Sequence, residues 1–180
     1  MAAFPHPDPP LTDGTVLLRG TRPEDAPAIT AACRDPEIPR WTNVPANYSI
    51  GHAHDFIARS WEQAARGEAL SLLAVDPGDG RLLGCVGLAT GGPYGPEVGY
   101  WVAPEARGRG VASRALALLR DWAPAALGFH RLVLRAHEDN VRSRRVAVAT
   151  GFTDTGQRVT GPHRGPAPEF ILYAWERSRA

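Results

Sequence analysis

The stretch EARGRGVASRALALLRDW, residues 105–122, decides the fold, because two arginines and two glycines stand directly ahead of an amphipathic helix. From Ala112 to Ala123 the apolar residues recur at i, i+3, i+4 and i+7, which predicts one buried helical face. We expect Pro124 to kink or end this helix. The preceding run EVGYWVA, residues 97–103, is typical of a strand. A strand, a glycine-rich turn and the start of a helix therefore meet at RGRG.

This junction is suited to binding an anion. The first four N–H groups of a helix lack intrahelical partners, and the helix dipole adds partial positive charge there. Gly108 and Gly110 let the backbone approach a phosphate closely, while Arg107 and Arg109 supply permanently charged, forked donors. The turn has neither the Lys-Ser/Thr of a P-loop nor the GxGxxG of a dinucleotide fold. Taken alone, RGRG could equally be a structural turn.

The rest of the chain predicts strands and hairpins followed by a β–α–β–α–β order. The capping-box spacing of Thr21 and Glu24 predicts a helix, and Ser49 is a plausible N-cap for another. The expected strands are 16–19, 70–75, 82–89, 97–103, 131–136 and 170–175, and the expected helices are 21–34, 50–66, 111–123 and 140–150, with a loop over 35–48. This pattern predicts one α/β (α+β) domain over residues 13–180, behind a flexible Pro-rich arm over 1–12.

Composition excludes several classes of partner. The net charge of +1 gives no general attraction to nucleic acid or anionic membrane, and no run of 18 apolar residues exists. Cys33 and Cys85 stand alone, without a CxxC or a Cys/His metal spacing, which favours a reduced cytoplasmic chain. His52 and His54 fall on different faces of their helix, so we expect no metal site. His137, in a polar HEDN turn, is expected to be solvated.

The motif segments resemble the GNAT (Gcn5-related N-acetyltransferase) superfamily over residues 97–152. EVGYWVAPEARGRGVA is similar to its acetyl-CoA motif, a strand followed by Q/R-x-x-G-x-G/A, here Arg107-x-x-Gly110-x-Ala112. NVRSRRVAVATGF is similar to its N-x-x-(A/S)…GF helix, here with Asn140, Ser143, Gly151 and Phe152. TRPEDA and the RWT around Trp41 resemble the branch of RimJ/RimL-like ribosomal-protein N-terminal acetyltransferases.

The resemblance implies a mixed, mostly antiparallel central sheet flanked by helices. Two central strands, 97–103 and 131–136, would splay apart and form the acetyl-CoA cleft. The implied contacts to acetyl-CoA come from Trp101, Val102, Ala103, Arg107, Gly108, Arg109, Gly110, Val111, Ala112, Asn140 and Ser143. The first three would bond the pantetheine arm through their backbone, and the turn amides would hold the pyrophosphate. The 3′-phosphate could be bound by any of Arg107, Arg142, Arg144 and Arg145.

Acetyl transfer to an amine needs a neutral amine, a stabilised oxyanion and a protonated leaving thiolate. A backbone N–H near Val102 is a natural oxyanion donor. Glu97 opens the motif strand, where some family members place a catalytic glutamate, so it is our candidate base, and an ordinary strand-end charge is the alternative. Direct attack needs no covalent enzyme intermediate, and we expect Cys85 to be a core residue.

The usual acid of the family is a tyrosine seven residues after the asparagine, and Ala147 stands there instead. Ser143 lies on the same helical face as Asn140 and is our candidate for assisting the departing sulfur. The alternative is that Ser143 only helps to bind coenzyme A.

Aromatic residues before position 62 are candidates for an acceptor pocket. We expect Trp41 and Tyr48 to line it, while Phe56 and Trp61 could line it or pack in the core. The predicted function is transfer of acetyl from acetyl-CoA to a primary amine, namely the α-amine of a ribosomal or other protein N-terminus. Alternatives are a small-molecule (antibiotic, polyamine or amino-acid) acetyltransferase, a non-catalytic CoA-binding module and, with less support, an RNA-binding domain. We expect a monomer or homodimer.

Overall fold

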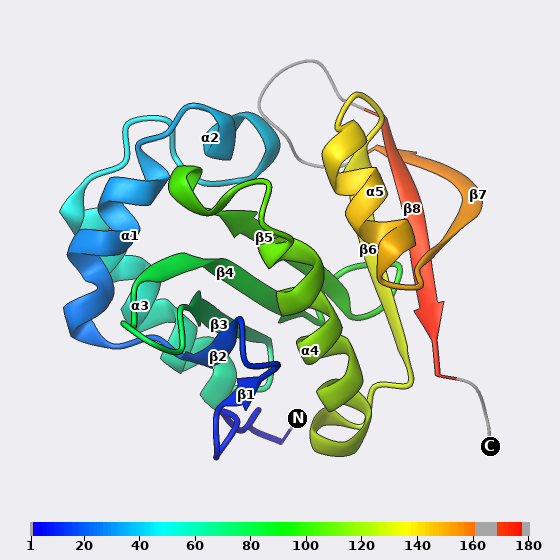
Figure 1. The fold of residues 1–180 in the computed structure, drawn as a ribbon. Helices are drawn as coiled ribbons and strands as arrows, with labels where there is room; N and C mark the ends of the chain where they lie inside the picture. The colour runs from blue at the N-terminus through cyan, green and yellow to red at the C-terminus, as the bar shows by residue number, and fades with distance from the viewer. Residues whose placement is uncertain (1, 161–168, 178–180) are drawn as a thin grey trace.

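The part of the protein that the structure describes folds around one eight-stranded sheet with helices on both faces (Figure 1). The computed structural model describes residues 2–160 and 169–177. In chain order the elements are β1 (Leu11–Thr12), β2 (Leu17–Gly20), the 3₁₀ helix η1 (Pro23–Asp25), α1 (Ala26–Cys33), α2 (Glu37–Trp41), α3 (Ile50–Ala65), β3 (Ala69–Val75), β4 (Leu82–Ala89), β5 (Glu97–Val102), the 3₁₀ helix η2 (Pro104–Ala106), α4 (Val111–Leu127), β6 (Arg131–His137), α5 (Val141–Ala149), β7 (Thr153–Thr160) and β8 (Glu169–Glu176).

The sheet is mostly antiparallel, with strand order β1-β2-β3-β4-β5-β6-β8-β7. β5 and β6 form a parallel pair, and they share one register position, Glu97 opposite Val133. The Val133 N–H donates to the Pro96 carbonyl at 2.9 Å, and beyond this point the two strands form no further ladder pairs. The predicted splay of two central strands is therefore confirmed.

Helices cover the two faces of the sheet in pairs. α1 and α3 pack on the face formed by β3 and β4, with Ile29, Ile57 and Leu73 in their shared apolar cluster. α4 covers β4 and β5 on the other face, and α5 lies beside α4 against β6. Leu116 and Leu119 of α4 are fully buried in the larger cluster. Within the described residues, no helix is both long enough and apolar enough to cross a membrane.

Two predicted segments differ from the structure near the N-terminus. The helix expected over 21–34 is divided into η1 and α1, because Asp25 accepts from the Arg22 N–H at 2.7 Å and caps a separate short turn. The expected loop over 35–48 contains the short helix α2, whose first N–H, from Glu37, donates to the Asp35 carboxylate at 3.0 Å. Ser49 caps α3 as predicted.

Three further features differ from what the sequence led us to expect or were not expected at all. Of the two outcomes expected at Pro124, a kink or an end, the end does not occur: α4 continues through the buried Pro124 to Leu127, because core packing of the ring outweighs one lost backbone hydrogen bond. β7 was missed because its residues are mostly polar and exposed. The first dozen residues, expected to be flexible, pack on the fold where described: the Phe4 N–H donates to the Ala64 carbonyl at 2.8 Å, and β1 pairs with β2.

Candidate active site

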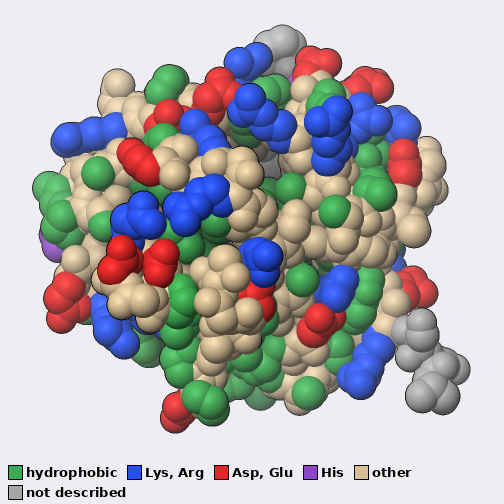
Figure 2. All heavy atoms as spheres, viewed as in Figure 1, with side chains coloured by type: hydrophobic (Ala, Val, Ile, Leu, Met, Phe, Trp, Pro, Cys, Tyr) green, Lys and Arg blue, Asp and Glu red, His purple; other side chains and the backbone are tan. Residues whose placement is uncertain are grey.

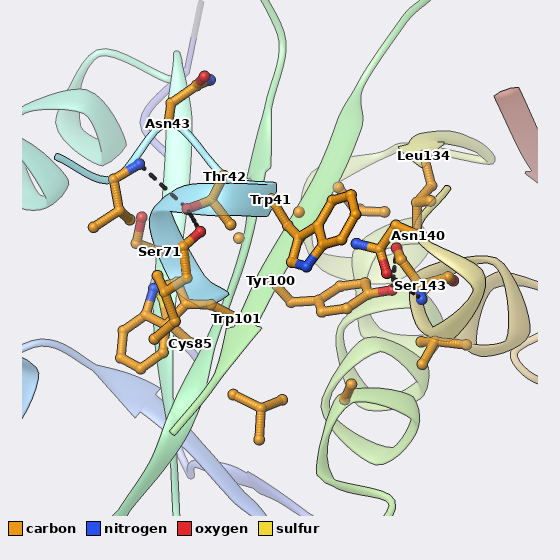
Figure 3. Close-up of a pocket in the computed structure, with 18 of the residues that line it drawn as sticks. Trp41, Thr42, Asn43, Ser71, Cys85, Tyr100, Trp101, Leu134, Asn140 and Ser143 are labelled. Atoms are coloured by element: carbon orange, nitrogen blue, oxygen red, sulfur yellow. Dashed lines mark hydrogen bonds between the residues drawn. The ribbon is translucent and has the colours of Figure 1, made fainter. Parts of the chain in front are cut away.

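A cavity of about 1430 Å³ opens where β5 and β6 part, and it reaches both faces of the sheet (Figure 3). On the α4–α5 side its lining includes Val111, Asn140 and Ser143, and on the α1–α3 side it includes Trp41 and Phe56. Pockets for a single drug-sized ligand are usually about 300–1,000 Å³. The cavity is therefore large enough for a cofactor and an acceptor together.

The backbone N–H groups of β5 point alternately toward β4 and toward this gap. The Ala103 N–H donates to the Leu83 carbonyl of β4 at 2.8 Å. Because antiparallel pairing alternates along a strand, the Trp101 N–H also faces β4, while the N–H groups of Tyr100 and Val102 face β6. Of the three backbone positions expected to bond a pantetheine arm, only Val102 directs its N–H into the gap. This is also the N–H expected to stabilise an oxyanion.

The RGRG turn has the backbone form expected of an anion site. Gly108 and Gly110 both have φ of +74°, and Gly110 is the N-cap residue of α4. A Cβ on Gly110 would meet no protein atom closer than the Arg114 Nε at 3.8 Å, so backbone conformation requires the glycine more than a steric clash does. Gly108, Gly110, Val111 and Ala112 line the cavity, which leaves the unpaired N–H groups of the first α4 turn beside it.

Some of the arginines expected to bind phosphate line the cavity, and others do not. Arg107 lines the cavity and bonds the Asp35 carboxylate at 2.6 Å, which holds the pKa of Asp35 below its usual range. Arg142 and Arg145 line the cavity and are exposed, and Figure 2 shows arginines gathered over α5. Arg109 instead borders a small hollow near Asp76.

Arg144 also turns away from the cavity. Its guanidinium donates to the Tyr173 hydroxyl at 3.4 Å and to the Glu138 carbonyl at 3.2 Å. Arg107, Arg142 and Arg145 therefore remain as the candidates for the 3′-phosphate.

α5 begins at the cavity, opposite the RGRG turn. Asn140 is its N-cap, and its Oδ1 accepts from the Ser143 N–H at 3.0 Å. Among the described residues, none accepts a hydrogen bond from the Asn140 amide nitrogen, so its two hydrogens are available to a ligand. Two helix N-termini, those of α4 and α5, thus flank the same cavity and favour bound negative charge.

Tyr100 is a residue of this site that the sequence reasoning missed. Its hydroxyl lies 2.8 Å from the Ser143 Oγ and 3.3 Å from the Ser143 carbonyl oxygen (Figure 3). Burial raises the pKa of Tyr100 to about 12, so its hydroxyl stays protonated near neutral pH. Strand alternation could have placed Tyr100 on the α4–α5 face, but its contact with Ser143 joins residues 43 positions apart.

Glu97 lines the cavity and forms an ion pair with Arg135 of β6. The Arg135 Nε donates to the Glu97 Oε1 at 2.8 Å, and both side chains are about three-quarters buried, with 20% and 24% exposed. Oε2 accepts no hydrogen bond from the described residues, so one oxygen remains available. Arg135 is a partner that the sequence reasoning did not identify, because β6 is 38 residues away.

Aromatic side chains form the cavity wall on the α1–α3 face. Trp41, Tyr48 and Phe56 line it, and Tyr48 is buried with a pKa raised to about 12. Trp61 lies elsewhere: it is 49% exposed and donates to the Thr21 carbonyl.

The expectation for His137 is wrong, and the expectation for Cys85 is confirmed. His137 is not a solvated turn residue, because its ring contacts Trp41 and Phe170 edge-on, at 5.5 and 5.8 Å between ring centroids. Cys85 is buried, as expected for a core residue, although it also reaches the cavity wall. Burial raises its pKa to about 12, which leaves almost no thiolate at neutral pH.

The gap, its in-pointing N–H groups and the two helix N-termini fit a thioester carried on a long phosphorylated arm. Residues 15–153 match the family described as the acetyltransferase (GNAT) domain. The chain therefore belongs to the GNAT family of acetyl-CoA-dependent acetyltransferases.

The chain is also similar to individual acetyltransferases. Over 79 residues the chain is 30% identical to YdaF of Bacillus subtilis strain 168, whose name assigns it to the ribosomal N-acetyltransferases, and the matching region spans 43% of each protein. The structure of RimL with coenzyme A gives a TM-score of 0.81 at 19% identity, over 93% of this chain and 97% of that one. MccE, a microcin self-immunity acetyltransferase with acetyl-CoA and AMP, gives 0.81 at 19%, over 94% and 99%. At these identities the structural likeness shows the fold alone.

Proposed function

We propose that the protein transfers acetyl from acetyl-CoA to the α-amino group of a protein or peptide N-terminus by direct attack. The observation that carries this proposal is one cavity that joins both faces of the sheet at the β5–β6 gap. The α4–α5 side offers helix N-termini and arginines for a phosphorylated donor, and the α1–α3 side offers an aromatic-walled space for an acceptor. RimL is named as an alpha-N-protein acetyltransferase of ribosomal L7/L12, and the name of YdaF assigns it to the ribosomal N-acetyltransferases. Both names support a protein N-terminus as the acceptor.

Bound acetyl-CoA would supply the activated acetyl thioester. The Val102 N–H would donate to the carbonyl oxygen as it gains negative charge. Glu97, through its available oxygen, or water would take the proton that the attacking nitrogen loses. As the carbon–sulfur bond breaks, the electron pair leaves on sulfur, and Ser143 would donate to that sulfur from the first turn of α5.

Direct attack is supported by the state of the cysteines. Cys85 reaches the cavity, yet its pKa of about 12 makes it a poor nucleophile at neutral pH. Cys33 is buried with a pKa also raised to about 12. Two buried free thiols also suit a reducing cytoplasm, where we place the reaction.

A small-molecule amine is the second candidate acceptor, because MccE shares the fold to the same degree as RimL.

The free-energy cost of deprotonating the amine separates transfer to α-amines from transfer to lysine. A neutral α-amine at pH 7 costs about 1 kcal/mol, whereas a neutral lysine amine costs about 4.6 kcal/mol. A site with one ion-paired carboxylate as its candidate base therefore favours α-amines.

The test is acetylation of peptides that carry both a free N-terminus and an internal lysine, with spermidine and free amino acids as small-molecule competitors. We expect the product on the α-amine, located by fragmentation mass spectrometry. The chain itself contains no lysine, so any ε-acetyl group must come from the peptide. Predominant lysine acetylation, or transfer confined to the small amines, would contradict the proposal.

A further inference from the structure

The Tyr100 hydroxyl bridges two elements that the gap separates. Tyr100 belongs to β5 and Ser143 to α5, and their oxygens lie 2.8 Å apart beside the cavity (Figure 3). Ser143 is the only hydroxyl-bearing residue of α5, and Asn140 fixes its backbone through the 3.0 Å cap bond. The Ser143 backbone position is therefore set by Asn140, and its side chain is contacted by Tyr100.

Two arrangements of the hydroxyl hydrogens are possible at this pair. If Tyr100 donates to the Ser143 carbonyl at 3.3 Å, the Ser143 hydroxyl can donate to the Tyr100 oxygen and its hydrogen is used inside the protein. If Tyr100 donates to the Ser143 Oγ at 2.8 Å, the Ser143 hydrogen is free to point into the cavity. The second arrangement uses the shorter contact, which is the stronger hydrogen bond by distance.

Tyr100 keeps its own proton in either arrangement. Burial raises its pKa to about 12, whereas an ordinary thiol has a pKa of about 8.5. Moving the phenol proton to a departing thiolate would therefore be unfavourable. The phenol can rotate its hydrogen between two acceptors without losing it.

We propose that Tyr100 is a positioning residue that donates to the Ser143 Oγ and so leaves the Ser143 hydrogen free for the departing sulfur. The inference rests on the proposed function, because it assigns a partner to the residue that contacts the leaving group. No bond to Tyr100 forms or breaks. Ser143 hydrogen-bonds the thiolate and keeps its own proton, and the thiolate takes its proton from water after it leaves.

The test compares Tyr100→Phe, Ser143→Ala and the double variant. Tyr100→Phe keeps the ring and removes one hydrogen bond, so we expect kcat to fall about tenfold with an unchanged acetyl-CoA Kd by calorimetry. Ser143→Ala should lower kcat on the order of 10²-fold. In the Ser143→Ala background, Tyr100→Phe should have no further effect.

Tyr94→Phe is the matched control, because the Tyr94 side chain is partly buried and its hydroxyl makes no hydrogen bond within the described residues. We expect it to keep the wild-type kcat. The loss in Tyr100→Phe should also be the same from about pH 6 to about pH 9, since Tyr100 stays protonated throughout. A loss that changes with pH across this range would show that Tyr100 gives up its proton and would overturn the inference.

Slow hydrolysis of acetyl-CoA by water, measured without acceptor, provides a second readout of sulfur departure. If the wild type transfers acetyl to no peptide while Tyr100→Phe still slows this hydrolysis, the proposed acceptor fails and the Tyr100 inference stands. An unchanged kcat in Tyr100→Phe, additive losses in the double variant, or a weakened Kd with normal kcat would each overturn it.

Discussion

The two faces of β5 differ in a way that separates the two substrates. Val98 and Tyr100 point toward α4 and α5, whereas Glu97, Gly99 and Trp101 point toward α1 and α3. The face toward α4 and α5 carries the Tyr100 hydroxyl, which contacts Ser143 of α5. The face toward α1 and α3 carries the Trp101 ring and the Glu97 carboxylate, with Gly99 between them.

The alternation along β5 allows one strand to contact two ligands. Side chains alternate between faces, but the backbone N–H groups of Tyr100 and Val102 lie in the plane of the sheet and point into the gap. A thioester held in the gap could thus be reached from both faces. We therefore expect substitutions on the two sides of β5 to affect different kinetic constants.

The largest effect should come from Gly110→Val. Its φ of +74° is strained for any residue with a Cβ, so the turn that presents the α4 N–H groups should change shape. Acetyl-CoA at 100 times its dissociation constant should raise the stability of the wild type by about 2.7 kcal/mol, seen as a higher Tm. Gly110→Val should lose this shift entirely.

Gly80→Val is the control for Gly110→Val. Gly80 has the same φ of +74° in the turn between β3 and β4, and it does not line the cavity. Its substitution should lower the Tm by backbone strain while keeping the shift with acetyl-CoA. A wild type that shows no shift at millimolar acetyl-CoA would contradict the proposed donor itself.

A smaller and more selective effect is expected from Gly99→Leu. A Cβ on Gly99 would meet no atom within 4 Å, so the side chain would enter open space on the acceptor face. The leucine should therefore compete with the acceptor, and we expect at least about a tenfold loss in kcat/KM for the peptide. The acetyl-CoA Kd should not change.

Gly99→Ala serves as the graded control, because one methyl group fills less of the space. If Gly99→Leu weakens acetyl-CoA and peptide equally, the two faces of β5 are not separate and the comparison fails. Normal kinetics with both variants would place the acceptor elsewhere in the cavity.

Much of the fold could be predicted because local signals agreed with it. The apolar stripe from Ala112 to Ala123 and the glycines of RGRG indicated α4 and its start, and the structure places them so. The missed elements had weak local signals: β7 is polar because only β8 pairs with it, and α2 depends on capping by Asp35. Pro124 shows that tertiary packing can outweigh a helix-breaking residue.

Single residues of the candidate site could be predicted from the sequence, whereas pairs of contacting side chains could not. Gly110, Asn140 and Ser143 were identified from motif spacing, and all three line the cavity. The partners Tyr100 and Arg135 were not, because Ser143 and Glu97 meet them only after the sheet forms. Long-range pairs of this kind leave no periodic signal in the sequence.

The smallest effect is expected from Glu97→Gln, and its pH dependence carries the information. An α-amine with a pKa of about 8 is roughly one-tenth neutral at pH 7, so a base that acts by removing the proton of the bound ammonium can improve the rate by about tenfold at most there. As the pH rises through the pKa of the amine, the neutral fraction approaches one and the benefit disappears. Glu97→Gln should therefore lower kcat/KM up to about tenfold near pH 7 and have no effect well above pH 8.

Glu176→Gln is the matched control for this last change. Glu176 also pairs with an arginine, Arg131 at 3.2 Å, but it does not line the cavity, so its loss should leave kcat/KM unchanged at every pH. If Glu97→Gln gives the same profile as the wild type, the amine loses its proton to water and Glu97 serves only to hold Arg135. A defect that is equal at all pH values would instead indicate that breaking the 2.8 Å pair distorts the acceptor face, and Glu97 would then lose its role as a base.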